Sequence, residues 1–531
     1  MGKYGSIEER IRCKSLLNKV MSPEQTIPLF KDGMSLGWSG FTPAGYPKAV
    51  PIALAEHVEK NNLQGKLRFN LFIGASVGPE TENRWAQNDM IDRRWPYQTG
   101  KDIAAGINAG RIRMGDKHLS LFAQDLGYGF YTKDNPGGKL DLAIIEVSAI
   151  TEDGGLVPTA SCGVIPEILM CCDKVIVEVN TAMPSFEGMH DIVVQKAPPH
   201  REILAITQAN TRVGTTYVPC DPSKIVAIVE SQHVDKGRAL ADADEASVAI
   251  AGHLMDFFAA EVKAGRLPKN LLPLQSGVGS IANAVVGGLA NGPFYNLSVY
   301  TEVLQDGMLD LFDSGRLDYA SSCSLSLSEN AGFPRFNEKR DFYAPKITLR
   351  PLSISNSPEV SRRLGVIAMN TPLEIDFYGH ANSTLVGGTR IINGIGGSGD
   401  FLRSGYLTIM HTPSVRPSKT DPLGICCVVP HVQHVDHTEH DLDVVVTDQG
   451  LADLRGLAPK DRAKCIIENC VHPVYKPILT EYLDMATKAC LAAKAGHEPQ
   501  LWDRVFKMQL NLAQNGTMRI KNWDIKLDLC E

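Results

Sequence analysis

The sequence lacks the features that mark membrane, nucleic-acid-binding and secreted proteins. No segment approaches the roughly 18 consecutive apolar residues of a membrane span, and the N-terminus has no apolar core of a secretory signal. A formal net charge of -7, without a long run of Lys or Arg, offers no electrostatic footprint for DNA or RNA. We therefore expect neither a membrane nor a nucleic acid among the partners of this chain.

Cysteine is also scarce, with 12 residues in a chain of 531. The adjacent pairs Cys171-Cys172 and Cys426-Cys427 do not have the C-x-x-C spacing of metal sites. Reduced thiols in an intracellular compartment, mostly buried as small apolar groups, account for this pattern.

The length exceeds the size at which a single hydrophobic core stops growing, so two domains are expected. The apolar fraction of 44% and the charged fraction of 21% are ordinary for a globular protein. The region from Pro219 to Ala241 is rich in Pro and charge and is the best place for a boundary. We predict an N-terminal domain over 1–225 and a C-terminal domain over 226–531.

Short runs rich in Val and Ile predict buried strands, and helical periodicity appears between them. The predicted strands are 67–73, 140–150, 175–179 and 225–229. From Asp242 to Ala264 apolar residues recur at helical spacing, and Gly265 follows as a stop. This alternation indicates an α/β fold with mostly parallel sheets and flanking helices, in which ligands bind at loops beyond the strand ends.

Each half contains a glycine-rich loop after a predicted strand, at 74–78 and at 276–280, which hints at two related layers. The second loop precedes a segment, 281–289, that can form a helix. Such a strand-loop-helix directs backbone N–H groups at an anion, as a CoA phosphate or a developing oxyanion requires. A tight turn explains the glycines equally well.

A further glycine cluster satisfies G-x-G-x-x-G at Gly394, Gly396 and Gly399. The following residues, 401–410, do not read as a clean helix, and no βαβ unit precedes the cluster, so we set NAD aside. The cluster still predicts a backbone that a ligand can approach closely.

Glu302 lies between the two C-terminal glycine clusters. The apolar residues before it predict a strand, and Gly307 predicts a turn into further structure. A carboxylate at a strand end could act as a nucleophile or a general base. The alternative is a solvated or salt-bridged surface glutamate.

Four histidines recur at every third position, at His431, His434, His437 and His440. Imidazoles with nearby carboxylates suit zinc or iron. The spacing fits neither helical pairs nor zinc fingers, and a polar loop between 425–429 and 444–446 explains it as well. We therefore assign no metal site.

Five stretches spread over nearly the whole chain together resemble the acetyl-CoA hydrolase/transferase family. They are LGWSGFT at 36–42, QSGVG at 275–279, YTEVLQD at 300–306, GIGGSGDF at 394–401 and VTDQGLADLRG at 446–456. Within that family the chain is similar to fungal-type members that behave as acetate:succinate CoA-transferases.

The resemblance implies a two-domain fold of the class I CoA-transferase type, in which Glu302 becomes a glutamyl-CoA thioester. It also implies that the Gly396 amide contributes to an oxyanion hole and that Asn356 lies near the nucleophile. Asp448 stands where the family pattern has Glu, so no role beside the nucleophile is assigned to it. The positions implied to lie along bound CoA are Gly277, Val278, Gly279, Ser280, Ile281, Ile392 and Gly396.

A carboxylate nucleophile suits CoA exchange without ATP, because the acyl anhydride that it forms can be reopened by the CoA thiolate. We predict transfer of CoA from acetyl-CoA, succinyl-CoA or propionyl-CoA to a carboxylate such as acetate or succinate. The alternatives are an acetyl-CoA hydrolase that uses the same Glu302, and a non-catalytic ligand-sensing module of related fold.

The expected partners are acyl-CoA and small carboxylates, with CoA as a substrate and no bound cofactor. We expect a homo-oligomer, a dimer. The compartment is mitochondrial or cytoplasmic, and only the resemblance favours mitochondria.

Overall fold

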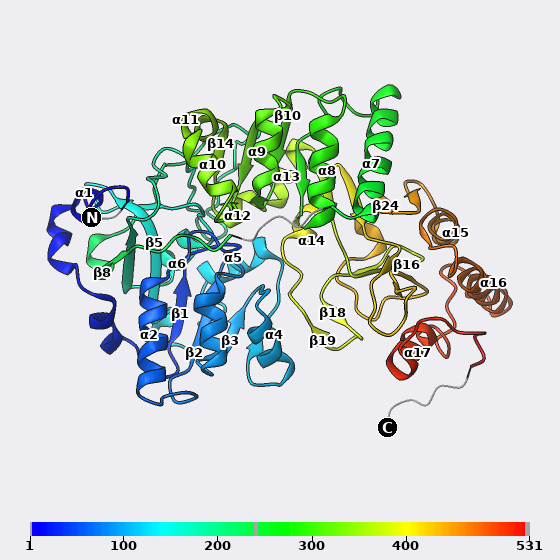
Figure 1. Ribbon diagram of the computed structural model, residues 1–531, viewed down its shortest axis with the longest axis horizontal. Helices are drawn as coiled ribbons and strands as arrows, with labels where there is room; N and C mark the ends of the chain where they lie inside the picture. Colours follow the sequence, from blue (N-terminus) through cyan, green and yellow to red (C-terminus); the bar gives the residue numbers. More distant parts are fainter. Residues whose placement is uncertain (1–2, 238–242, 278, 526–531) are drawn as a thin grey trace.

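The computed structural model describes residues 3–237, 243–277 and 279–525. The chain forms two α/β halves, and each half is built around one large, mostly parallel sheet, as Figure 1 shows. The N-terminal half contains the sheet of β1 to β8, and the C-terminal half contains the sheet that begins with β9. This architecture confirms the predicted fold class. Among the described residues, no helix combines the length and apolar character that a bilayer crossing requires.

The first sheet has the strand order β4-β3-β2-β1-β5-β7-β8, with β6 paired antiparallel to β5. Its strands are β1 (Ser35–Trp38), β2 (Phe69–Ile73), β3 (Ile91–Trp95), β4 (Arg113–Met114), β5 (Leu142–Ile150), β6 (Leu156–Pro158), β7 (Val175–Asn180) and β8 (Ile225–Ser231). The four strands predicted from Val- and Ile-rich runs are therefore present. All nine residues of β5 are buried, as expected for a strand covered on both faces.

Short helices accompany this sheet. They are α1 (Ile7–Arg10), α2 (Ala49–Lys60), α3 (Arg84–Gln87), α4 (Lys101–Asn108), α5 (Leu119–Gly127) and α6 (Ile165–Met170). The glycine loop at 74–78 follows β2 and is packed closely. A Cβ on Gly78 would lie 2.2 Å from the Tyr46 hydroxyl, so this loop has a structural reason for its glycine.

The second sheet has the order β14-β12-β10-β9-β15-β20-β24-β25, and only β25 runs antiparallel to its neighbour. Its strands are β9 (Leu274–Ser276), β10 (Leu297–Tyr300), β12 (Leu317–Ser322), β14 (Ile347–Leu349), β15 (Ile367–Asn370), β20 (Leu407–His411), β24 (Val444–Thr447) and β25 (Gly450–Asp453). β9 and β10 lie in the middle of the sheet, where parallel strands are most deeply buried.

Helices α7 (Glu245–Lys263), α8 (Ser280–Asn291) and α9 (Asp306–Asp313) lie side by side along this sheet (Figure 1). α7 begins after Asp244, whose side chain accepts from the Ser247 N–H, so the predicted helix is present. Gly307, where a turn into further structure was predicted, is the second residue of α9. Its apolar neighbours Met308, Leu309, Leu311 and Phe312 are buried by helical packing.

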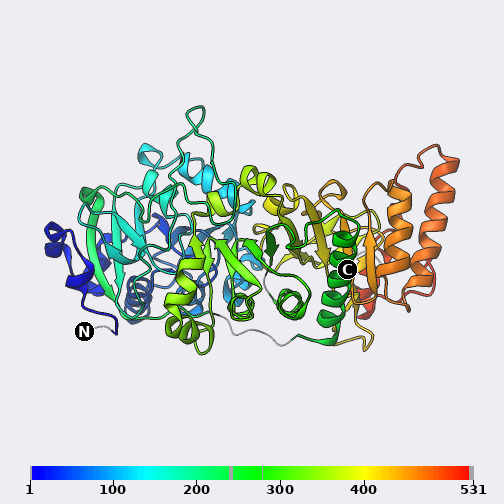
Figure 2. The same cartoon turned by 90° about the horizontal axis from the view of Figure 1, so that it is seen from above.

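The remaining helices of this half are shorter or lie at its end. They are α10 (Gly332–Glu338), α11 (Arg340–Tyr343), α12 (Leu352–Ser355), α13 (Pro358–Leu364), α14 (Ser398–Leu402), α15 (Pro459–Cys470), α16 (Lys476–Ala492) and α17 (Lys507–Asn515). α15 and α16 pack together at the far end of the molecule, as Figure 2 shows.

Small sheets of two or three short strands surround the loops beyond the second sheet. They are β11 (Val303–Leu304) with β13 (Ser324–Leu325), β16 (Glu374–Asp376) with β17 (Ala381–Asn382) and β23 (Val428–Val429), β18 (Leu385–Val386) with β19 (Arg390–Ile391), and β21 (Val415–Arg416) with β22 (Ile425–Cys426).

The segment between the two sheets bears on the domain boundary. β8, which begins at Ile225, pairs along its length with β7 and completes the first sheet, so the Pro- and charge-rich region from 219 to 241 contains a strand. The next strand of a large sheet begins at Leu274. The division at 225/226 stays a prediction about folding units, whereas the sheets themselves separate after Ser231.

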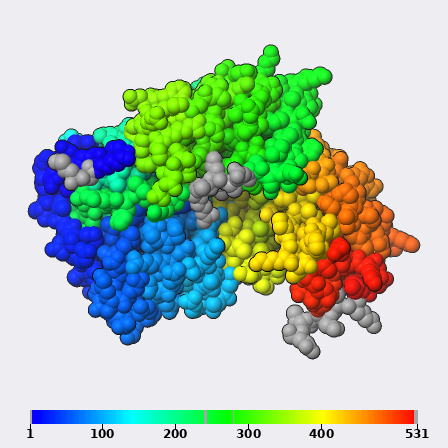
Figure 3. Space-filling view, viewed as in Figure 1, coloured from blue at the N-terminus to red at the C-terminus, as the bar shows by residue number. Residues whose placement is uncertain are grey.

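Backbone hydrogen bonds join the two halves beside the ends of their strands. Cys162 donates to the Cys323 carbonyl at 3.2 Å, and Leu325 donates to the Ala160 carbonyl at 2.8 Å. Figure 3 shows the yellow surface, formed by residues near 400, against the light blue surface of the N-terminal half. The loops of one half therefore complete the surroundings of the other.

Candidate active site

Glu302 lies directly beyond the carboxyl end of β10, between that strand and β11. Its backbone is fixed, because its carbonyl accepts from the Cys323 N–H at 3.1 Å. The preceding residue, Thr301, donates its hydroxyl to the Ser276 carbonyl at the end of β9, at 3.1 Å. The predicted strand therefore exists and presents Glu302 at the edge where parallel sheets bind ligands.

The Glu302 carboxylate is held by Asn356. The Asn356 side-chain N–H donates to Glu302 Oε2 at 2.6 Å. The Ser355 hydroxyl donates to Asn356 Oδ1 at 2.9 Å, which turns the amide nitrogen toward the carboxylate. The predicted proximity of Asn356 to the nucleophile agrees with this contact, and its catalytic role stays a prediction.

A chain of hydrogen bonds extends from Glu302 into the N-terminal half. The Asn356 side-chain nitrogen also donates to Asp400 Oδ2 at 3.2 Å. Asp400 in turn accepts from the Ser120 hydroxyl at 2.6 Å and from the Ser120 backbone N–H at 3.0 Å. Asn356, Asp400 and Ser120 are all buried, so this path is shielded from water.

Burial and charge hold the Glu302 proton tightly. Burial, together with the nearby Asp400 carboxylate, raises the pKa of Glu302 to about 8, although the Asn356 hydrogen bond opposes this shift. Burial also raises the pKa of Asp400 to about 6, against the opposing hydrogen bonds from Ser120. Catalytic carboxylates commonly have a pKa that their surroundings have shifted toward neutral pH, as is the case for Glu302.

The glycine loop at 394–399 passes directly over Glu302. A Cβ on Gly397 would lie 1.7 Å from Glu302 Oε2 and 2.4 Å from Asn356 Nδ2, so only glycine fits. Gly396 has a φ of 63°, in the left-handed region that favours glycine. The loop thus covers the carboxylate with backbone atoms, as the sequence predicted for a close approach.

The N-terminal half clamps the same loop. The Ile395 N–H donates to Asp116 Oδ2 at 2.8 Å. A Cβ on Gly399 would lie 2.3 Å from the His118 ring, which therefore packs against the loop. Together with the Ser120–Asp400 contacts, these interactions fix the loop from the side of α5.

A cavity of about 300 Å³ opens beside Glu302 at the junction of the two halves. Loops after β9, β10 and β15 form much of its wall, and Thr42 and Tyr97 come from the N-terminal half. Its lining residues are Thr42, Tyr97, Gln275, Ser276, Gly277, Glu302, Val303, Asn370, Thr371, Pro372, Leu373, Ser383, Asn393, Gly394, Ile395, Gly396, Gly397, Ser398 and Arg416.

Only two of the residues predicted to lie along CoA are part of the cavity wall. Gly277 and Gly396 line the cavity with Glu302. Ile281 is packed in the hydrophobic core, and Ile392 is 37% exposed outside the cavity wall. Gly279 and Ser280 begin α8 beside the cavity without lining it. Val278 lies outside the described residues.

The four histidines do not converge. His431 contacts Asp376 at 2.8 Å, His434 contacts Asp436 at 3.2 Å, and His440 contacts Glu439 at 3.4 Å. His437 is buried, and its Nε2 lies 2.9 Å from the Ser398 hydroxyl. Within the described ranges, the only triad of possible metal ligands is Asp376, His380 and His431, in which both imidazoles already hydrogen-bond to the Asp376 carboxylate.

The Asp448 carboxylate hydrogen-bonds to Ser414 and not to Glu302. It follows β24 and accepts from the Ser414 N–H at 2.5 Å and from the Ser414 hydroxyl at 3.0 Å. It therefore caps a neighbouring loop and has no recorded contact with Glu302.

Several residues of the site carry no local signal in the sequence. Ser120 and Asp400 touch only after the halves dock, since 280 positions separate them. Thr42 lies in the LGWSGFT stretch, so that motif marked a wall of the cavity. Tyr97 and Arg416 have no motif that could have identified them.

Comparison with solved structures defines the class of fold. RipA from Yersinia pestis superposes with a TM-score of 0.66 at 21% identity, covering 88% of this chain and 98% of that one. A 4-hydroxybutyrate CoA-transferase from Porphyromonas gingivalis superposes with a TM-score of 0.60 at 20% identity, covering 89% and 99%. The fold is that of the CoA-transferases.

Sequence comparison then narrows the class to one family. Residues 6–230 match the acetyl-CoA hydrolase/transferase N-terminal domain, and residues 332–483 match the corresponding C-terminal domain. The acetyl-CoA hydrolase of Schizosaccharomyces pombe is 57% identical over 518 residues, or 97% of this chain and 99% of that protein. The chain belongs to the acetyl-CoA hydrolase/transferase family, as the resemblance predicted.

Proposed function

We propose that this chain cleaves acyl-CoA thioesters with the Glu302 carboxylate as the nucleophile. The observation that carries the proposal is the position of Glu302 in the cavity wall, where Asn356 orients its carboxylate. A strand end and a side-chain amide fix this group, so little reorganisation is needed before attack.

The reaction begins when Glu302 attacks the thioester carbonyl. The C–S bond breaks, CoA leaves as the thiolate, and the acyl group is left on Glu302 as an anhydride. The thiolate then attacks the Glu302 carbonyl, which releases the acid as its carboxylate and leaves a glutamyl-CoA thioester. Backbone N–H groups of the loop around Gly396 would stabilise the oxyanions that form on this path.

The fate of the glutamyl-CoA decides between two activities. Attack by water restores Glu302 and releases CoA, which completes hydrolysis of acetyl-CoA. The name of the Schizosaccharomyces pombe relative favours this outcome. A second carboxylate that attacks the glutamyl-CoA carbonyl instead displaces the CoA thiolate and forms a new anhydride. The thiolate then attacks the acyl carbonyl of this anhydride, which releases Glu302 and the new acyl-CoA. This CoA transfer between acetate, succinate or propionate is the second candidate. A cation in the cavity wall, Arg416, favours it because it suits an anionic acceptor.

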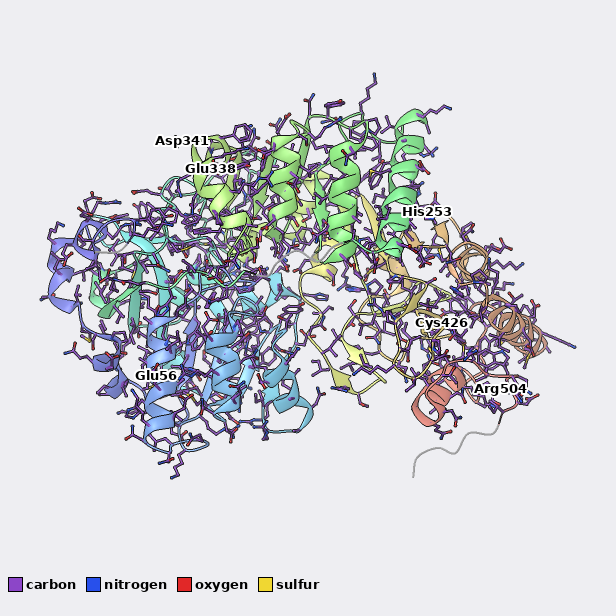
Figure 4. The ribbon with its side chains drawn as sticks, in the orientation of Figure 1. Glu56, His253, Glu338, Asp341, Cys426 and Arg504 are labelled. Atoms are coloured by element: carbon purple, nitrogen blue, oxygen red, sulfur yellow. The ribbon has the colours of Figure 1, made fainter. Side chains whose placement is uncertain are left out.

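The adduct provides the test. The protein is mixed with acetyl-CoA, and its intact mass is measured before and after borohydride reduction, which converts a glutamyl thioester to an alcohol. Glu302→Gln should lose both the adduct and CoA release while CoA still binds. Glu338→Gln, an exposed position labelled in Figure 4, is the matched control and should behave as the parent.

Full turnover without Glu302 would remove the proposed mechanism. Binding of acyl-CoA without turnover in the parent would favour the ligand-sensing alternative. The rate of acetyl-CoA consumption, measured with and without succinate, separates the two activities. A hydrolase releases free CoA at a rate that is indifferent to the acceptor, whereas a transferase consumes acetyl-CoA when succinate is present and forms succinyl-CoA. A dimer, the absence of a bound cofactor, and a mitochondrial or cytoplasmic location stay predictions.

A further inference from the structure

His437, one of the four regularly spaced histidines, contacts the glycine loop at 394–399. The residue is 2% exposed, and its Nε2 lies 2.9 Å from the Ser398 hydroxyl. Its backbone is fixed in a bridge with Ala381, in which each residue donates its N–H to the carbonyl of the other, at distances of 2.9 and 3.1 Å. A buried imidazole on a fixed backbone therefore supports the loop that covers Glu302.

The direction of the hydrogen bond between His437 and Ser398 follows from the protons available. The Ser398 hydroxyl also donates to the Ile395 carbonyl at 2.9 Å, and a hydroxyl has only one proton to give. His437 Nε2 is therefore the donor to Ser398. Burial lowers the pKa of His437 to about 3, so the imidazole is neutral throughout the working pH range and its single proton is on Nε2. Nδ1 has no hydrogen-bond partner among the described residues, so a proton there would be left unpaired.

The carbonyl that Ser398 holds belongs to the same peptide unit as the Gly396 N–H. The bond between Ile395 and Gly396 is trans, so the carbonyl and the N–H lie in one plane and point in opposite directions. The Ile395 N–H is also held, by Asp116 Oδ2 at 2.8 Å. Because both polar groups of Ile395 are anchored, the direction of the Gly396 N–H is fixed.

The Gly396 N–H is available to a ligand. Gly396 lines the cavity beside Glu302, and within the described part of the chain no acceptor is recorded for its N–H. A buried backbone N–H is normally paired, so an open one in a cavity wall is suited to an acceptor that arrives with the substrate. An N–H with a fixed direction can bind a developing oxyanion without first breaking another hydrogen bond.

We propose that His437 and Ser398 are positioning residues that orient the Gly396 N–H toward the oxyanion formed on the reacting thioester. The inference rests on the proposed function and deepens it, because it names the side chains that hold the oxyanion donor in place. His437 donates to Ser398, Ser398 donates to the Ile395 carbonyl, and the opposite edge of that peptide presents the Gly396 N–H to the thioester oxygen. Neither side chain exchanges a proton with the substrate.

The test measures the rate of Glu302 adduct formation, by rapid quench and intact mass, at increasing concentrations of acetyl-CoA. This series separates the maximal rate from the half-saturating concentration. In Ser398→Ala the maximal rate should fall at least about tenfold, because a loosely held donor loses part of the roughly 100- to 1000-fold that one oxyanion donor contributes. The half-saturating concentration should stay within about twofold of the parent, because the oxyanion donor acts in the transition state and not in binding.

Two variants of His437 test its part in this arrangement. His437→Leu removes the donor to Ser398 and should lower the maximal rate about three- to tenfold, the contribution of one hydrogen bond. His437→Gln has a side-chain N–H that can replace the Nε2 donor, so its rate should stay within about twofold of the parent. This second variant keeps the proposal testable if His437→Leu does not fold. His440→Leu, at an exposed position of the same series, is the matched control and should behave as the parent.

A double variant and a pH profile separate this role from other effects. Ser398→Ala with His437→Leu should be no slower than Ser398→Ala alone, because His437 acts through Ser398. Neither side chain is among the groups that shift the pKa of Glu302, so the midpoint of adduct formation should stay near pH 8 in Ser398→Ala.

Four results would overturn the proposal. The parent rate in Ser398→Ala would show that the Gly396 N–H needs no support from Ser398. A rise in the half-saturating concentration as large as the fall in rate would show that the substitution displaces the loop or the substrate. Additive losses in the double variant would show that His437 acts elsewhere, and a shifted midpoint would place the effect on Glu302 itself. Failure of the proposed function appears separately, as a parent protein that forms no Glu302 adduct with acetyl-CoA.

Discussion

Replacing Asp400 with Asn should make the nucleophile ionise at lower pH. Asp400 accepts from Ser120 through both oxygens and from Asn356 through one. An Asn at 400 can keep all three contacts, because its oxygen can accept from the Ser120 N–H and from Asn356 while its NH₂ donates to the Ser120 hydroxyl. The substitution therefore removes a charge with little change in geometry.

Asn356 bridges the carboxylates of Glu302 and Asp400, and the distance between them sets the size of the pKa shift. Asn356 Nδ2 lies 2.6 Å from Glu302 Oε2 and 3.2 Å from Asp400 Oδ2, so the two oxygens are at most about 6 Å apart. At an effective dielectric constant of ~20, two unit charges at this distance repel by about 3 kcal/mol, or about 2 pH units. Since the pKa of Asp400 is about 6, it is charged where Glu302, with a pKa of about 8, titrates.

The assay is the rate of formation of the Glu302 adduct, measured by rapid quench and intact mass from pH 5.5 to 9. In the parent the rate should rise with pH to a midpoint near 8, because only the ionised carboxylate attacks. In Asp400→Asn the midpoint should fall by about 1–2 pH units, so adduct formation near pH 6.5 becomes roughly tenfold faster. The plateau should not rise, because a less basic carboxylate is a weaker nucleophile.

Asp341→Asn, at the outer surface in Figure 4, controls for loss of a carboxylate and should leave the midpoint unchanged. An unchanged midpoint in Asp400→Asn, or a move to higher pH, would refute the electrostatic coupling.

Three further predictions concern the frame of the site. Gly397→Ala should lower turnover at least ~100-fold, because the new Cβ would lie 1.7 Å from Glu302 Oε2. Gly252→Ala, whose Cβ would have nothing within 4 Å, should leave turnover unchanged in the same assay. Glu302→Gln should raise the melting temperature at pH 8 more than at pH 5. The pKa of Glu302 in the folded protein is about 8 and the ordinary value is 4.5, so the parent loses stability as the pH rises from 4.5 to 8, and the neutral Gln does not. Equal shifts at the two pH values would contradict the argument from burial. Lys48→Met should lower the melting temperature by roughly 10 °C, because Lys48 is buried between Glu146 at 2.6 Å and Asp235 at 2.7 Å. Lys60→Met, at an exposed position, should shift the melting temperature little. A small change for Lys48→Met would show that the buried ion pairs of Lys48 make no net contribution to stability.

The sequence predicts the strands and singles out Glu302, the proposed nucleophile, because both are local signals. β5 and β7 are rich in Val and Ile, as buried parallel strands usually are, and Glu302 comes shortly after the mostly apolar β10. Gly307, predicted to turn the chain into further structure, lies in the first turn of α9, so the sequence located the change of direction but not the helix that follows.

The rest of the site depends on tertiary contacts that no local pattern encodes. Asp400 lies in the GIGGSGDF stretch but had no predicted role, and Ser120 lies in no motif. Their contact depends on the docking of α5 against the loop at 394–399, which sequence periodicity does not describe. The regular spacing of the histidines likewise reflects a loop whose side chains point to different partners.

The link between Ser120 and Asp400 also has a consequence for biosynthesis. A ribosome must add 280 more residues after Ser120 before its partner exists, and the first sheet is complete long before then. A chain that ends before residue 394 therefore has Glu302 and the N-terminal half but lacks the glycine loop and Asp400 that connect them, and it should form no Glu302 adduct with acetyl-CoA. Two separately expressed halves should regain turnover only on reassembly, so catalysis reports whether the molecule has been finished.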